Sequence, residues 1–240
     1  PLRIDLPPGR YGVFVFGAPS YGFRWSEGLR AKINGNEHVL LPASSDAEVR
    51  RAMDICVDNA NRAIFNAANA NPQYAGMGTT LVVTLFYDNM MTVAHIGDSR
   101  LYRLRGDEFQ AITRDHSLLQ EQIDSGMITA DEARHSQNKN LVTRALGVDP
   151  VVEPEIRDYD TMPGDLYLLC SDGLNDMVED EEIALTLQAL SANLDLAATQ
   201  LIQTANDSGG RDNVSVVLVR IAREYPAARS WWTRLLQWFK

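Results

Sequence analysis

The segment Leu166-Tyr167-Leu168-Leu169-Cys170-Ser171-Asp172-Gly173 joins an unbroken apolar run to an acidic turn. Because such a run leaves neither face of a strand polar, it predicts a central β-strand that is buried on both sides. Asp172 then lies at the mouth of the core, where an unpaired carboxylate is costly in free energy. A bound dication would relieve that cost, whereas an Asp that caps the turn before Gly173 is the common alternative.

Two further acidic turns border predicted strands, and they are Gly97-Asp98-Ser99-Arg100 and Gly209-Gly210-Arg211-Asp212-Asn213. Taken singly, each has an ordinary explanation: a hairpin turn in which Asp98 pairs with Arg100, or a flexible turn that contains Asp212. Carboxylates from three strand ends that a fold brings together form the all-oxygen site that Mg²⁺ or Mn²⁺ prefers. We therefore predict metal-assisted hydrolysis, with three metal ligands, Asp98, Asp172 and Asp212.

Patterns elsewhere in the chain predict an α+β fold. A capping box at Ser45 and Glu48 opens a helical apolar pattern that ends near Asn71-Pro72. Later strand patterns are separated by short turns, which favour antiparallel pairing. The predicted helices cover residues 26–32, 45–71, 117–126, 129–136, 180–190 and 194–206, and the predicted strands cover residues 11–16, 79–87, 91–96, 101–105, 109–113, 166–170 and 214–221. This order predicts a sandwich with mostly antiparallel sheets inside and helices outside.

Amino-acid composition and net charge limit which kinds of partner and which cellular compartment we predict for this chain. The chain has 240 residues, of which 45% are hydrophobic, a net charge of −10 and a pI near 4.8. This is enough for one sizeable core, and the acidic balance argues against nucleic acid, whose binding depends on Lys and Arg contacts to phosphate. Cys56 and Cys170 lie in apolar runs without metal-ligand spacing, so we predict buried free thiols in a reducing cytoplasm. We find no signal peptide and no apolar run long enough to span a bilayer.

A C-terminal tail, residues 223–240, follows the predicted domain of residues 1–222. Its last part, residues 227–240, is basic and places its large apolar side chains on one helical face, namely Trp231, Trp232, Leu235, Leu236 and Phe239. A basic amphipathic helix of this kind fits peripheral contact with the inner membrane, or docking on a partner protein. Packing of the tail against its own domain is an equally weighted alternative.

A series of short motifs runs from about Gly76 to Ile221. In order, they are Gly76-Met77-Gly78-Thr79-Thr80, Ala94-His95-Ile96-Gly97-Asp98-Ser99-Arg100, Leu101-Tyr102-Arg103, Thr113-Arg114-Asp115-His116-Ser117, Leu141-Val142-Thr143-Arg144-Ala145-Leu146-Gly147, Pro163-Gly164-Asp165, Leu169-Cys170-Ser171-Asp172-Gly173-Leu174 and Gly210-Arg211-Asp212-Asn213-Val214-Ser215. In order and spacing this series resembles the bacterial type-2C metal-dependent serine/threonine protein phosphatases. Motifs of this density rarely arise by chance.

The resemblance implies a four-layer α-β-β-α sandwich of two mostly antiparallel sheets flanked by helices, with two or three Mg²⁺ or Mn²⁺ ions. It implies that Asp172 and Asp212 bind the second core metal, and that Asp98 with Asp172 binds a more weakly held third metal. Residues 113–147 would form a flap beside the cleft, and a water bridging the metals would be the nucleophile. The implied substrates are phosphorylated proteins, the products of a Ser/Thr kinase.

The N-terminal part departs from the family pattern. In the family, a strand in the N-terminal part ends in Asp-Gly-Met-Gly-Gly, whose Asp bridges both core metals. Here the matching strand, residues 13–16, runs into Gly17-Ala18-Pro19-Ser20-Tyr21-Gly22, which contains no Asp. The chain also begins at Pro1 rather than Met, as a processed product or a fragment would. Without the bridging carboxylate, two dications repel each other more strongly, so the core metals should bind more weakly. Two hypotheses stay open, a working phosphatase and a pseudophosphatase that only binds phosphoproteins or another partner.

Overall fold

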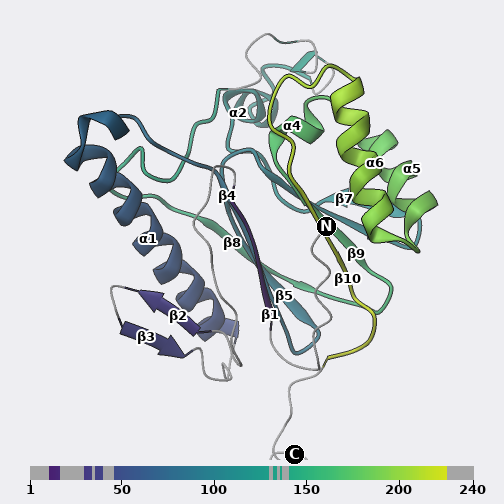
Figure 1. Ribbon diagram of the computed structural model, residues 1–240, viewed down its shortest axis with the longest axis horizontal. Coiled ribbons are helices and arrows are strands. Elements are labelled where there is room, and N and C mark those ends of the chain that lie inside the picture. Colours follow the sequence, from purple (N-terminus) through teal and green to yellow (C-terminus); the bar gives the residue numbers. More distant parts are fainter. Residues whose placement is uncertain are drawn as a thin grey trace, which may run out of the picture.

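The computed structural model describes residues 11–16, 30–33, 36–39, 46–129, 132–133, 136 and 141–225 (Figure 1). Three predicted features lie outside these residues: the turn at 17–22, the capping residue Ser45 and the amphipathic segment 227–240. Across the part that is described, no helix combines the length and the apolar character needed to cross a membrane.

Two four-stranded antiparallel sheets form the centre of the fold. The first has the strand order β1-β4-β5-β8, the second has the order β10-β9-β6-β7, and a separate small sheet pairs β2 with β3. The strands are β1 Tyr11–Phe16, β2 Arg30–Ile33, β3 Asn36–Val39, β4 Leu81–Tyr87, β5 Met90–Ile96, β6 Arg100–Arg105, β7 Glu108–Ala111, β8 Glu155–Asp160, β9 Leu166–Cys170 and β10 Val216–Arg220.

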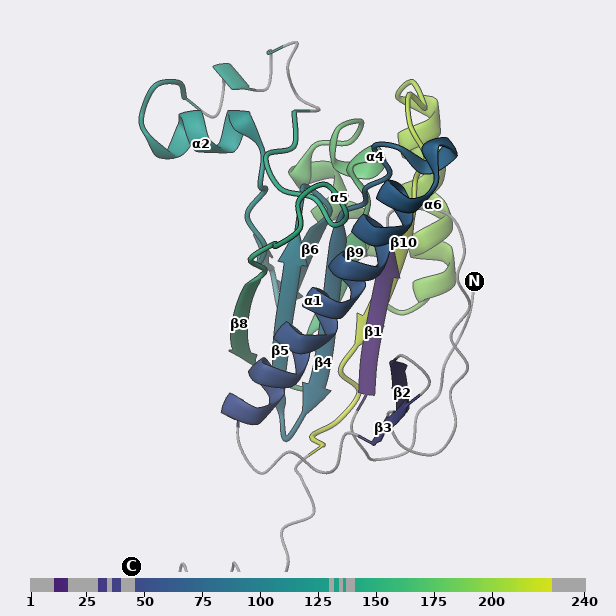
Figure 2. The same ribbon diagram turned by 90° about the vertical axis from the view of Figure 1, so that its left-hand side faces the viewer.

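Helices cover the outer faces of the two large sheets. The helices are α1 Asp46–Ala70, the short 3₁₀ helix η1 Pro72–Tyr74, α2 Leu118–Asp124, α4 Asp172–Asn175, α5 Asp180–Leu190 and α6 Leu194–Asp207. Helix α1 lies across the first sheet, in front of β4 and β5 in Figure 2, and α5 and α6 pack on the second sheet. This confirms the predicted α+β class and the four-layer α-β-β-α order.

Alternation along β9 shows how one strand serves two layers of the core. Three of its side chains face the helices α5 and α6, namely Leu166, Leu168 and Cys170. The other two, Tyr167 and Leu169, face the first sheet. Because all five are buried, the strand has no polar face, and its unbroken apolar run is the physical result of being covered on both sides.

Three strands, β2, β3 and β8, differ from the prediction. The helix predicted over residues 26–32 is wrong where the chain is described, because Arg30–Ile33 is a strand that pairs with Asn36–Val39. Strand β8, Glu155–Asp160, was not predicted; it is an edge strand whose side chains are half-buried or exposed, so its apolar signal is weak.

Candidate metal centre

Three acidic turns lie at the same end of the strands of the second sheet because of the register of those strands. Arg100 of β6 and Val216 of β10 both pair with Cys170 of β9, and β9 runs antiparallel to each of them. The segments before β6, after β9 and before β10 therefore lie together at one end of these three strands. These segments carry the three predicted ligands, Asp98, Asp172 and Asp212.

The three carboxyl groups are electrostatically coupled through Asp172. Asp98 is only 8% exposed, and burial, followed by the charge of Asp172, raises its pKa to about 6. The pKa of Asp172 is also raised, first by burial and then by the charge of Asp212. The fold thus places Asp172 within electrostatic reach of both other acids, as the sequence analysis expected; their role as metal ligands stays a prediction.

Hydrogen bonds from Ser171 lock the turn of Asp172 to the loop of Asp212. The Ser171 hydroxyl donates to the Asn213 carbonyl at 3.0 Å and accepts from the Ser215 amide at 3.0 Å, and the Ser171 amide donates to the Ser215 carbonyl at 3.1 Å. Gly173 is needed at this crossing because a Cβ there would lie 2.4 Å from the Asn213 carbonyl oxygen. The two acids are therefore held by direct contact between their turns.

The turn that carries Asp98 is fixed in a different way. Gly97 has φ +102°, a value that L side chains rarely adopt, and an added Cβ would lie 2.3 Å from Cγ2 of Thr80. Thr80 in turn exchanges a hydrogen bond of 2.8 Å with the Ser99 hydroxyl. Glycine at position 97 thus lets the turn pack against Thr80 and sets the direction in which the chain continues to Asp98.

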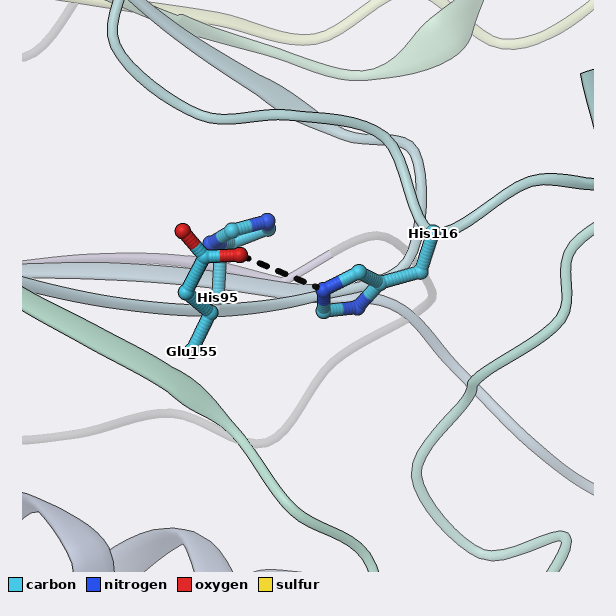
Figure 3. A group of neighbouring side chains, drawn as sticks. All are labelled: His95, His116 and Glu155. Atoms are coloured by element: carbon cyan, nitrogen blue, oxygen red, sulfur yellow. Dashed lines mark ion pairs between the residues drawn. The ribbon is translucent and has the colours of Figure 1, made fainter. Parts of the chain in front are cut away.

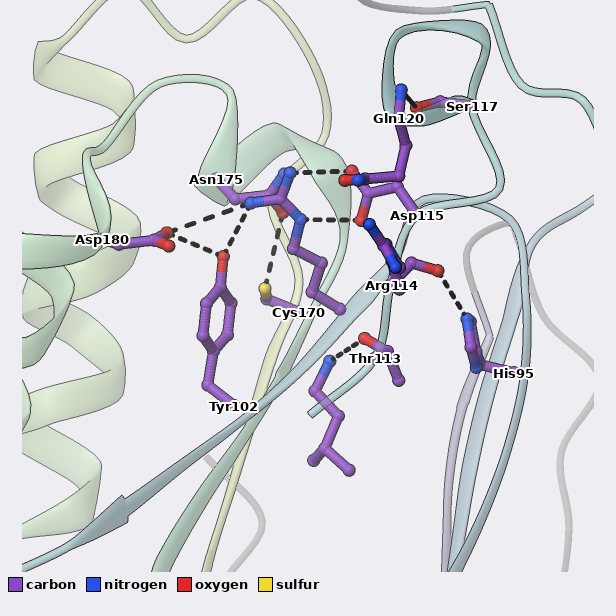
Figure 4. A network of polar contacts seen from close by, with 12 residues as sticks. His95, Tyr102, Thr113, Arg114, Asp115, Ser117, Gln120, Cys170, Asn175 and Asp180 are labelled. Atoms are coloured by element: carbon purple, nitrogen blue, oxygen red, sulfur yellow. Dashed lines mark hydrogen bonds and ion pairs between the residues drawn. The ribbon is translucent and has the colours of Figure 1, made fainter. Parts of the chain in front are cut away.

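Arg100 binds three polar groups beside these turns, those of Asp115, Tyr102 and Asp180, which Figure 4 labels. Its Nε and Nη2 atoms donate to the two carboxylate oxygens of Asp115 at 2.8 and 2.7 Å. Its Nη1 donates to the Tyr102 hydroxyl at 2.9 Å, which donates to Asp180 at 2.9 Å. Arg100 therefore binds Asp115, and the alternative of a hairpin turn with an Asp98–Arg100 pair is not what forms.

Asp115 is an acid of this region that the sequence analysis did not assign. Its negative charge contributes to the raised pKa of both Asp98 and Asp172, so it lies close to the acidic turns. It follows the predicted strand 109–113, and the criterion that selected the other acids, an Asp just past a strand, would have found it as well. We note its proximity and assign it no metal.

The donor set fits a hard divalent cation. Carboxylate oxygens are the ligands that Mg²⁺ and Mn²⁺ favour. Raised pKa values at Asp98 and Asp172 show that these groups are hard to ionise together without a counter-charge. A dication between them would remove that cost.

Comparison with known proteins shows which family the chain resembles. The family model described as protein phosphatase 2C matches residues 30–214. The serine/threonine protein phosphatase PstP of Mycobacterium tuberculosis is 41% identical over 169 residues, which cover 70% of this chain and 32% of that protein. Protein phosphatase PhpP of Streptococcus pneumoniae is 39% identical over 153 residues, which cover 63% of this chain and 61% of the relative. The chain thus spans less than two thirds of the length of either relative.

Solved structures show the same fold. The S. agalactiae serine/threonine phosphatase has a TM-score of 0.71 at 33% identity, over 76% of this chain and 75% of that chain. The catalytic domain of PstP, solved in complex with 2 manganese ions, has a TM-score of 0.66 at 40% identity, over 75% of this chain and 73% of that chain. With the family match and the arrangement of the acidic turns, these likenesses show that the chain belongs to the protein phosphatase 2C family.

Proposed function

We propose that the chain hydrolyses phosphoserine and phosphothreonine in phosphorylated proteins, using Mg²⁺ or Mn²⁺ held by Asp98, Asp172 and Asp212. The observation that carries the proposal is that these acids lie together at one end of β6, β9 and β10, with a raised pKa at Asp98 and Asp172. Two relatives that are named protein phosphatases support it, as does the relative solved with manganese. Phosphoproteins made by a Ser/Thr kinase are the substrate class that we infer.

Two coupled pairs of carboxylates suggest two ion positions. Asp172 and Asp212 interact electrostatically, and so do Asp98 and Asp172. We assign the first pair to the second core metal and the second pair to a more weakly held third metal. When bound, such ions would supply an activated water and offset negative charge on the phosphoryl oxygens. The chain's own contribution is to hold the carboxylates at fixed positions through the bonds of Ser171 and the conformation of Gly97.

Metal-dependent turnover is the direct test. The purified chain should hydrolyse para-nitrophenyl phosphate and a phosphothreonine peptide when Mn²⁺ or Mg²⁺ is added, and EDTA should abolish the activity. Asp172→Asn should lower kcat/KM by more than the 10- to 100-fold that removal of even an outer-shell group costs at metal sites. Asp107→Asn is the matched control, because Asp107 lies in the turn at the opposite end of β6, and its activity should equal that of the parent.

The pseudophosphatase hypothesis predicts the opposite result. A folded chain that shows no turnover at millimolar Mn²⁺, or whose turnover survives Asp172→Asn, would overturn the proposal. Binding of a phosphopeptide without its hydrolysis would then support the alternative of a binding module.

The domain limits and the tail are part of the same proposal. We assign residues 1–222 to a type-2C phosphatase-like domain, residues 113–147 to a flap and residues 223–240 to a tail that contacts the membrane periphery or a partner. The apolar and basic composition of residues 227–240 supports the tail's role. Co-sedimentation with anionic liposomes should be stronger for the full chain than for a chain that ends at residue 226, and equal pelleting would rule out the membrane role.

A further inference from the structure

His95, His116 and Glu155 form a cluster that contains none of the three predicted metal ligands (Figure 3). The cluster touches one of the acidic turns, because the Gly97 amide donates to His116. The two imidazole rings are stacked, with centroids 4.6 Å apart and planes 21° apart, and Glu155 Oε2 is 3.8 Å from His116 Nε2. His95 is 2% exposed and His116 is 7% exposed. Among the described residues, His116 Nε2 is one of the few buried side-chain atoms that have no hydrogen-bond partner.

A metal ion is a poor occupant for this cluster, although its ligand atoms lie within 4.8 Å of one another. Imidazole binds a metal through an in-plane lone pair, and stacked rings direct their lone pairs along nearly parallel planes instead of toward one point. The His116 Nδ1 atom also accepts a hydrogen bond from the Gly97 amide, so the proton of the neutral ring resides on Nε2. That protonated nitrogen is the atom that would have to bind the metal.

The contacts of His116 instead point to the turn before Asp98. Both backbone polar groups of Gly97 are bonded to His116: the Gly97 amide donates to His116 Nδ1 at 3.2 Å, and the His116 amide donates to the Gly97 carbonyl at 2.9 Å. Gly97 is the residue with φ +102° that directs the chain into Asp98. His116 therefore fixes the orientation of the peptide groups on either side of Gly97.

The neighbours of His116 keep its Nδ1 able to accept. Burial, followed by the charges of His95 and Arg144, lowers the pKa of His116 to about 4, so the ring is neutral at physiological pH. The stacked His95 ring is itself fixed, because its Nε2 is 2.8 Å from the Arg114 carbonyl and donates to it. An imidazolium at position 116 would have a proton on Nδ1 and would face the Gly97 amide donor to donor.

His116 also joins this turn to the predicted flap. Its carbonyl accepts from the Thr143 amide at 2.8 Å, and the Leu118 amide donates to the Leu141 carbonyl at 2.9 Å. An isolated bridge between Ser117 and Val142 lies between these bonds. The two ends of the segment between residues 117 and 143 are thus hydrogen-bonded to each other beside His116, the residue that also binds Gly97; we call these paired ends the base of the segment.

We propose that His116 is a positioning residue whose unprotonated Nδ1 fixes the Gly97–Asp98 turn and couples the place of the Asp98 carboxylate to the base of the 117–143 segment. This inference rests on the proposed function, because the place of Asp98 matters for catalysis only if Asp98 binds a metal. His116 itself touches no reacting atom in this scheme.

Two amide variants of His116 test the proposal. His116→Asn places an oxygen near the position of Nδ1 and can still accept from Gly97, whereas His116→Gln places its amide near Nε2 and leaves the Gly97 amide unpaired. We expect the Mn²⁺ concentration for half-maximal binding, measured by calorimetry, to rise about 3- to 10-fold in the Gln variant and less than about twofold in the Asn variant. We also expect kcat at saturating Mn²⁺ to change less than the Mn²⁺ requirement. Equal shifts in both variants, or none in either, would overturn the proposal.

Two measurements on the metal-free chain separate this proposal from the proposed function. Long-range ¹H–¹⁵N NMR should show a bare Nδ1 and a protonated Nε2 on His116, and the Gly97 amide should exchange with solvent faster in His116→Gln than in His116→Asn. A proton on Nδ1, or equal exchange rates, would refute the positioning role. A chain that passes both measurements but binds no Mn²⁺ would instead refute the proposed phosphatase function.

Discussion

Asp98 carries a free-energy cost in the metal-free fold. Its pKa is raised from 3.8 to about 6, so the folded chain holds the Asp98 proton more tightly than the unfolded chain does. Ionising Asp98 therefore destabilises the fold. The cost is absent below the unfolded pKa, grows as the pH rises, and levels off above about pH 6 at roughly 3 kcal/mol.

Asp98→Asn should remove this cost. Without metal, the variant should be more stable than the parent by up to roughly 3 kcal/mol near pH 7.5, and the difference should shrink toward zero near pH 4. Urea unfolding at several pH values in EDTA measures it. Adding Mn²⁺ should stabilise the parent more than the variant. A difference that does not change with pH would contradict the assigned cause.

A second prediction concerns the close contact at Gly173 between the turns of Asp172 and Asp212. An added methyl group would lie 2.4 Å from the Asn213 carbonyl oxygen, so Gly173→Ala should push the two acidic turns apart, weaken Mn²⁺ binding and cost about 1–3 kcal/mol of stability. Gly106→Ala is the control, because its Cβ meets nothing within 4 Å and its cost is the strain of φ +59°, about 1–2 kcal/mol. Both variants should lose stability, but only Gly173→Ala should lose Mn²⁺ affinity. Calorimetric titration distinguishes the two.

Strand β4 contains an unusual polar group at its centre. Thr84 is fully buried, and within the described chain its hydroxyl has no hydrogen-bond partner. A buried, unpaired hydroxyl costs free energy that an apolar group of the same shape does not. Thr92 on the neighbouring β5 is equally buried, but its hydroxyl donates to Asp158 at 2.6 Å and contacts the Tyr87 hydroxyl at 3.0 Å.

These two threonines form a matched pair. Thr84→Val should stabilise the chain by about 1 kcal/mol, and Thr92→Val should destabilise it by about 1–3 kcal/mol, because Asp158 loses the Thr92 donor at Oδ1 and keeps the Arg50 donor at Oδ2. The midpoint of urea unfolding measures both. Destabilisation by Thr84→Val would mean that its hydroxyl does have a partner.

Helices and strands with a clear pattern of apolar residues could be predicted from the sequence, and those that depend on contacts between distant residues could not. Strand β9 could be predicted because burial on both sides demands an unbroken apolar run. The short turn predicted between strands 79–87 and 91–96 forms at Asp88-Asn89, where both residues adopt positive φ values, 44° and 60°. Strand β8 was missed because an edge strand needs only a partly apolar face. The three predicted ligands were selected by their places next to strands, and Asp115 meets the same criterion without having been selected.

The arrangement of layers explains why Asp98 and Asp172 are buried enough for their pKa values to be raised. The second sheet is covered by the first sheet on one face and by α5 and α6 on the other, so the turns of Asp98 and Asp172 lie next to buried strand residues such as Cys170. The class of fold followed from the patterns alone, whereas the pairing of β6, β9 and β10 that unites the acids follows from contacts between distant residues. Coupling between Asp98 and Asp172 is therefore a property of the assembled sheets that no local pattern encodes.

The bonds of Ser171 have a consequence for the chain during its synthesis. The hydroxyl is satisfied by residues 42 and 44 positions downstream, which leave the ribosome long after β9. A nascent polypeptide that ends before Asp212 has Asp98 and Asp172 but lacks both the third acid and the bonds that join Ser171 to the loop of Asp212. The proposed ion site is thus completed last, after almost all of the domain has been synthesised.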